Sequence, residues 1–115
     1  MRRRPDTRDG DLLGGTLDML ILQTLTRGPA HGFAIAQSVG ERSADVLLIE
    51  EGSLYPALHR LEERGWVRAA WGLSANNRRA KFYTITAKGR KQLAAESTRW
   101  AQLAGAIARV MEPTS

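Results

Sequence analysis

The sequence contains no cysteine, which excludes disulfide bonds, thiolate zinc sites and a cysteine nucleophile. It has only two histidines, and it lacks both a Gly-x-Ser-x-Gly elbow and a glycine-rich phosphate loop. Its longest apolar runs, residues 19–22 and 46–49, are far shorter than the ~20 residues needed to cross a bilayer. We therefore expect a cytoplasmic protein that is not an enzyme and has no cofactor, no metal ion and no membrane partner.

The chain has 115 residues, enough for one compact domain, and a formal net charge of +5. The positive charge is concentrated between residues 66 and 92, a segment that contains no acidic residue. Its basic residues are Arg68, Arg78, Arg79, Lys81, Lys88, Arg90 and Lys91. Such a concentration is typical of a polyanion-binding surface, although charge alone favours the simpler interpretation of a solvated basic stretch.

The amino-terminal half has the pattern of a tail followed by two helices. Residues 1–11 mix arginine with aspartate and predict a mobile tail. Apolar residues then recur at helical spacing after Thr16, a candidate cap, until Gly28 and Pro29 end the helix. A second helix is predicted over residues 31–42, with an apolar face formed by Phe33, Ile35, Ala36 and Val39. Residues 46–49 fit either a short strand or a turn.

The third predicted helix has the clearest pattern. Leu54, Leu58 and Leu61 form a stripe that faces a core, and Gly65 ends the helix. Ser53 is a candidate cap, and Pro56 falls where a missing backbone N–H is tolerated.

After Gly65 the period changes toward two, which predicts a hairpin with strands at residues 66–71 and 81–86 and a polar tip at 72–80. Thr86 would then cap a final helix over residues 87–111. The predicted fold is mainly α with a small β-hairpin. It comprises a flexible tail (1–11), a winged helix-turn-helix domain (12–86) and a long C-terminal dimerisation helix with a short tail (87–115).

In such a fold the third helix is the recognition helix, and its exposed side faces DNA. Ser53 and Tyr55 could bond phosphates or bases, and His59 or Arg60 could reach bases or the backbone. Each has a structural alternative, since Ser53 could only cap and Tyr55 could only pack. The hairpin tip, with Asn77, Arg78 and Arg79 followed by Lys81, suits insertion into a minor groove or contact with the DNA backbone.

The last helix carries an apolar stripe of coiled-coil type, which predicts a homodimer seam. Its members are Leu93, Trp100, Leu103, Ala104, Ile107 and Val110, with Met111 at its margin. The alternative is that the stripe packs back on its own domain near Leu12, Leu13 and Leu17. A tryptophan at a dimer seam can also line a pocket for a small flat apolar effector, although burial in the interface is its commoner role.

Four stretches resemble the PadR family of bacterial transcriptional regulators, particularly its short-tailed branch. They are LLGGTLDMLILQTL, GPAHGFAIA, EEGSLYPALHRLEERGW and NNRRAKFYTITAKGRKQL, and together they cover roughly residues 11–93. The resemblance implies a winged helix-turn-helix repressor that binds an inverted repeat of double-stranded DNA as a homodimer. By motif match, it implies DNA contacts at Ser53, Tyr55, Pro56, His59, Arg60, Asn77, Arg78, Arg79 and Lys81. The alternative function is a winged-helix module that binds proteins and not DNA.

Overall fold

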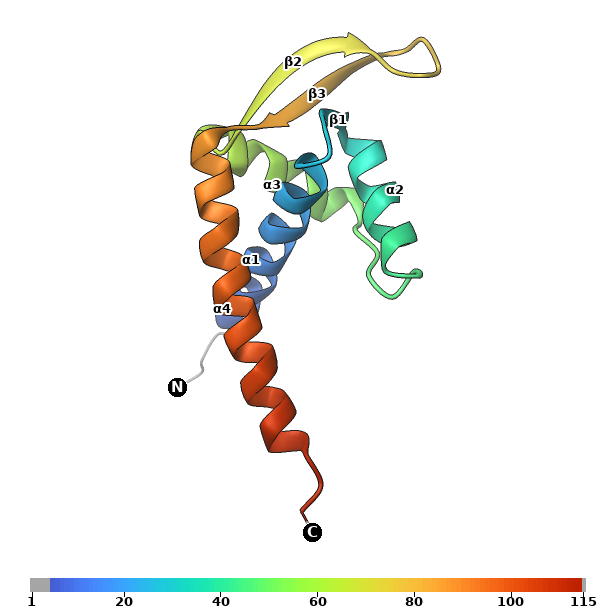
Figure 1. Ribbon diagram of the computed structural model, residues 1–115. Coiled ribbons are helices and arrows are strands. Elements are labelled where there is room, and N and C mark those ends of the chain that lie inside the picture. Colours follow the sequence, from blue (N-terminus) through green and yellow to red (C-terminus); the bar gives the residue numbers. More distant parts are fainter. Residues whose placement is uncertain (1–4, 115) are drawn as a thin grey trace.

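The computed structural model describes the backbone of residues 5–114 and the side chains of residues 15–114. Within this part there are four helices and one antiparallel sheet, and the sheet lies at one end of the helices (Figure 1). In chain order the elements are α1 (Pro5–Leu25), β1 (Ala30–His31), α2 (Gly32–Arg42), α3 (Glu51–Glu63), β2 (Val67–Leu73), β3 (Arg79–Ile85) and α4 (Ala87–Met111). The predicted fold class, mainly helical with a hairpin and a long last helix, is confirmed. No helix among residues 5–114 combines the length and apolar character needed to span a membrane.

One hydrophobic core joins α1, α2, α3, the base of the sheet and the start of α4. The predicted stripe of Leu54, Leu58 and Leu61 lies in its centre, with none of the three side chains more than 1% exposed. Isoleucine and leucine residues of α1, together with Ile35 of α2, pack against this stripe. The recognition helix predicted from the sequence is therefore anchored along one side, which leaves its other side at the surface.

Helix α3 begins earlier than the sequence suggested. Its N-cap is Glu50 and no side chain caps it, so the prediction that Ser53 caps this helix is wrong. Pro56 is consequently the sixth residue of α3, in its second turn, and the carbonyl of Gly52 has no backbone N–H four residues later. The predicted end is confirmed, because Gly65 adopts a φ of 75° and the N–H of Trp66 returns to the carbonyl of Leu61.

The sheet has the order β1-β3-β2, and its short first strand was not predicted. Strands β2 and β3 form the hairpin, or wing, in which Val67 pairs with Ile85 and Leu73 with Arg79. The tip is shorter than predicted because β2 continues to Leu73. As a result Arg79, expected on the loop, is the first residue of β3.

Helix α1 begins at Pro5, so residues 5–11, which we expected to form a tail, are helical and Thr16 is not a cap. Residues 1–4 lie outside the described part of the chain. Once a helix has formed, each added residue contributes one hydrogen bond without a new nucleation cost. Extension toward the amino terminus therefore needs no apolar pattern of its own.

Helix α2 has the predicted extent, but Phe33 does not belong to its buried face. Ile35 and Val39 are buried, whereas 67% of Phe33 is exposed and its ring stacks beside that of His31. His31 also caps the helix, since its Nδ1 accepts a hydrogen bond from the N–H of Ala34. Residues 46–49 form no strand, and Val46 and Leu48 are exposed.

Helix α4 has the predicted bounds, and Thr86 caps it by accepting a hydrogen bond from the N–H of Gly89 at 3.0 Å. Its first half packs along α1, and its second half extends beyond the rest of the domain (Figure 1). The molecule is elongated as a result, with principal extents of 58 × 37 × 26 Å.

Candidate nucleic-acid interface

A groove of about 890 Å³ lies between the wing and the first turns of α2 and α3. The pairing of Trp71 with Lys81 and of Leu73 with Arg79 places these four side chains on one face of the hairpin. Trp71, Arg79 and Lys81 of this face line one wall of the groove. His31, Phe33 and Tyr55 line the other wall. The groove therefore combines aromatic surface with the cations of the wing, a combination that suits a polyanion with apolar sugars and bases.

The exposed side of α3 presents four of the five predicted residues. Ser53, Pro56 and His59 are exposed, and His59 makes only a long contact of 3.9 Å to Glu63. Tyr55 is half-exposed and lines the groove. Its ring lies so close to Gly32 that a Cβ atom there would be 2.7 Å from a ring carbon, and this close approach fixes the ring beside α2.

Arg60, the fifth predicted residue on α3, has a different placement. Its Nη2 lies 2.6 Å from Oδ1 of Asp18 on α1, in a pair whose arginine is about one-third exposed and whose aspartate is nearly buried. The guanidinium is thus engaged within the protein and not presented freely at the exposed side of α3.

The amino-terminal end of α3 carries two acidic residues, Glu50 at the cap and Glu51 in the first turn. Carboxylates at this end interact favourably with the helix dipole and repel a phosphate. A phosphate contact at this end of α3 is therefore disfavoured, and contacts from the exposed side of the helix are favoured instead.

The four predicted wing residues differ in what surrounds them. Asn77 has a φ of 61° and makes the turn, while Arg78 at the tip is exposed. The guanidinium of Arg79 lies over the ring of Trp71, with its carbon 4.6 Å from the ring centroid. Lys81 is half-buried, and its Nζ lies 3.5 Å from Oε1 of Glu62 on α3, so the charge of this lysine is partly compensated.

The sequence prediction missed Trp71, Phe33 and His31 as groove residues. Trp71 could have been found by extending the alternation of β2 past Gly72, since that register places it opposite Lys81. Phe33 and His31 come from β1 and α2, and no local pattern places them beside the wing.

The stripe of α4 divides into a buried and an exposed part. Leu93 is only 9% exposed and belongs to the core of its own domain, so its assignment to a dimer seam is wrong. The remaining large side chains are 42–81% exposed, and Ala104 is half-buried. They are Trp100, Leu103, Ile107, Val110 and Met111.

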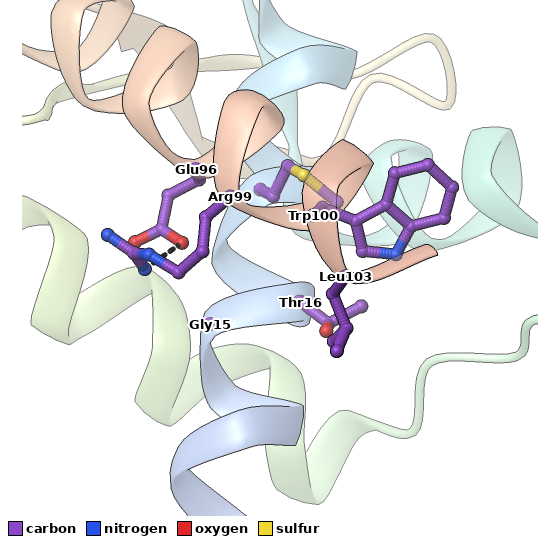
Figure 2. A pocket seen from close by; sticks show the side chains of 7 residues that line it. Gly15, Thr16, Glu96, Arg99, Trp100 and Leu103 are labelled. Carbon is purple, nitrogen blue, oxygen red and sulfur yellow. Dashed lines mark hydrogen bonds and ion pairs between the residues drawn. The ribbon is translucent and has the colours of Figure 1, made fainter. Parts of the chain in front are cut away.

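Trp100 and Leu103 border a small pocket between α4 and α1 (Figure 2). Gly15, Thr16 and Met19 of α1 line its other side, and its volume is about 90 Å³. The predicted packing of this helix near its own α1 therefore holds for the first part of the stripe. Leu17 packs against the core, and the side chains of Leu12 and Leu13 lie outside the described residues.

Three core helices, a basic hairpin beside the third and a long last helix define the winged helix-turn-helix class of protein. Residues 21–95 match the model of the PadR-like family of transcriptional regulators, and the chain belongs to that family. The family is one of transcriptional regulators.

Several known proteins are similar to this chain in sequence or in fold. An uncharacterised protein X from Lysinibacillus sphaericus is 29% identical over 102 residues, which are 89% of this chain and 94% of that protein. A transcriptional regulator from Clostridium thermocellum superimposes with a TM-score of 0.79 at 26% identity, covering 89% of this chain and 99% of the other. A PadR family regulator from Eggerthella lenta gives a TM-score of 0.73 at 29% identity, covering 95% and 93%.

Proposed function

We propose that this protein is a sequence-specific repressor that binds an inverted-repeat operator as a homodimer, through α3 and the wing. The observation that carries the proposal is the groove, because one wall holds Arg78, Arg79 and Lys81 and the other holds Tyr55 of α3. In winged helix-turn-helix proteins the recognition helix enters the major groove of the DNA. The phosphodiester strand that borders this groove then passes between the recognition helix and the wing. A groove with cations on the wing side supports this mode of binding.

The exposed part of the α4 stripe supports the homodimer. Exposed apolar residues that continue along a helix surface on a monomer mark an interaction site. A second copy of α4 would bury Ile107 and Val110, which contact nothing in their own domain core. A flat apolar effector beside Trp100 is a finer prediction, and the partner's helix would have to complete its pocket, since a drug-sized ligand needs roughly 300 Å³ or more.

The test begins with footprinting on the DNA upstream of the protein's own gene, where we expect a protected inverted repeat with half-sites about one helical turn apart. Binding to that operator is then measured over a salt series. Arg78→Ala should weaken binding to all duplexes and lower the salt slope by about one, because one phosphate contact is lost.

Arg68→Ala is the matched control, because Arg68 is also exposed on the wing but pairs with Thr84 on the face away from the groove. It should leave the slope unchanged. If the salt slope changed equally for both variants, the groove side of the wing would not be part of the DNA interface. If the wild-type protein retains no duplex in dilute buffer, the alternative of a protein-binding module replaces the proposal.

A further inference from the structure

Asp18 is the one buried charged side chain among the residues whose side chains are described. It lies on α1, and its carboxylate accepts a hydrogen bond of 2.6 Å from Arg60, which stands 42 positions later on α3. The contact joins the helix that carries the candidate DNA-reading residues to the helix against which α4 packs. Arg60 is thus placed at the junction between the two functional parts of the molecule.

Two other charged groups act on Asp18, Glu96 and Arg64, and neither forms an ion pair with it, so Arg60 is its partner. Glu96 of α4 lies close enough to repel it, but that carboxylate accepts hydrogen bonds of 2.8 Å from Gln92 and Arg99 of its own helix. Arg64, one turn beyond Arg60, attracts Asp18 without bonding to it, and its guanidinium lies over the ring of Trp66.

This pair is poorly explained as a source of stability. Burial raises the pKa of Asp18, and this effect exceeds the opposing hydrogen bond and charge of Arg60. Ionisation of the carboxylate is therefore less favourable inside the protein than in water, as is common for buried ion pairs. The directional fork of the guanidinium does, however, restrict how α3 can rotate or slide on α1.

We propose that Arg60 is a positioning residue that, with Asp18, fixes the orientation of α3 on α1 and does not itself contact DNA. This inference rests on the proposed function. In a dimer joined through α4, the seating of α3 on α1 determines how far apart the two recognition helices lie. The pair thereby contributes to the choice of half-site spacing.

The test compares wild type with Asp18→Asn, Arg60→Gln and the double variant. Binding is measured over a salt series to the footprinted operator, to the same operator with one base pair inserted between the half-sites, and to a scrambled duplex. Each single variant should bind the operator more weakly by a factor of about five to thirty. The double variant should bind no more weakly than the worse single variant, because both changes remove one interaction.

Two further readouts separate positioning from contact and from general damage. The salt slope and the binding to scrambled DNA should stay at wild-type values, and the preference for the native spacing over the inserted one should fall. If Arg60→Gln folds poorly, Asp18→Asn still provides the test. Asp18→Asn leaves Arg60 without its carboxylate partner, but the Arg60 side chain is already partly exposed to solvent. Circular dichroism before each titration identifies the folded variants.

A phosphate contact by Arg60 would give the opposite pattern. Arg60→Gln would then lower the salt slope by about one, and Asp18→Asn, which releases the guanidinium, would leave binding as strong or stronger. That result overturns this inference alone. If wild type itself shows no preference for the operator over the scrambled duplex, the proposed function fails and the positioning role fails with it.

Discussion

Three arginines that the sequence assigned to the interface have different surroundings, and these determine what each can contribute. Arg60 is paired with a buried carboxylate, Arg79 lies over a tryptophan ring, and Arg78 is exposed at the tip of the wing. The guanidinium of Arg79 is held by the ring and keeps its geometry when DNA binds, so this side chain loses less entropy. The guanidinium of Arg60 orients α3 instead. Arg78 instead remains free to follow the DNA backbone.

The raised pKa of Asp18 predicts how its ionisation affects stability. Between its ordinary value of 3.8 and the higher value in the folded protein, the folded state binds more protons at this carboxyl than the unfolded state. The stability associated with this proton is therefore fully present below pH 3.8 and is lost as pH rises through the folded pKa. Asp18→Asn, which cannot ionise, should lack this loss.

Urea unfolding of both proteins from pH 3.5 to 7 checks this prediction. The free energy of unfolding of Asp18→Asn minus that of wild type should become more positive as pH rises, at roughly 1.4 kcal/mol for each unit by which the pKa is raised. A difference that becomes more negative with rising pH would mean that Arg60 outweighs burial and lowers the pKa.

At the scale of elements, the most restrictive contact is where α4 leaves the sheet. A Cβ atom on Gly89 would lie 2.1 Å from the carbonyl oxygen of Trp66, which itself accepts a hydrogen bond from the N–H of Thr86 at 3.1 Å. Backbone atoms on both sides cannot turn aside as a side chain can. The turn after α3 and the first turn of α4 are thus packed backbone against backbone.

Gly89→Ala should therefore lower the free energy of unfolding by about 1–3 kcal/mol or more, because α4 must move away from the turn after α3. The measurement is urea denaturation followed by circular dichroism. Gly15→Ala is the control, since its added methyl group would meet only Glu96 at 3.7 Å inside a helix. That change should be neutral or stabilising by up to ~1 kcal/mol. Equal destabilisation of both variants would contradict the contact.

An element could be predicted from the sequence when the residues that determine it lie close together along the chain. The leucine stripe of α3, the cap at Thr86 and the turn at Gly65 depend on neighbours a few positions away, and they were predicted correctly. The exposure of Phe33 and the pairing of Arg60 with Asp18 depend on contacts between distant segments. No local pattern contains that information, so these parts of the site needed the structure.

At the scale of the whole molecule, the proposed DNA-binding and dimer surfaces lie at opposite ends of an elongated body. The wing and its groove are at one end, and the exposed half of α4 is at the other (Figure 1). The first half of α4 packs along α1 and reaches the core through Leu93. A dimer formed by the free halves of α4 would leave both grooves open, so that two half-sites could be bound together.

Ile107→Glu should therefore dissociate the dimer, because it places a carboxylate in the middle of the exposed stripe. Sedimentation should show a particle of 12.7 kDa in place of one twice that mass. Operator affinity should fall by a factor of about 10²–10⁴, while binding to a single half-site should not change, because linking two binding modules gives a gain of that size. Gln102→Glu, an exposed position on the opposite side of α4, adds the same charge and should preserve both mass and affinity. If Ile107→Glu keeps the dimer mass, the dimer contact lies elsewhere on the molecule. If the wild-type protein itself sediments at 12.7 kDa, the exposed stripe of α4 does not form a homodimer.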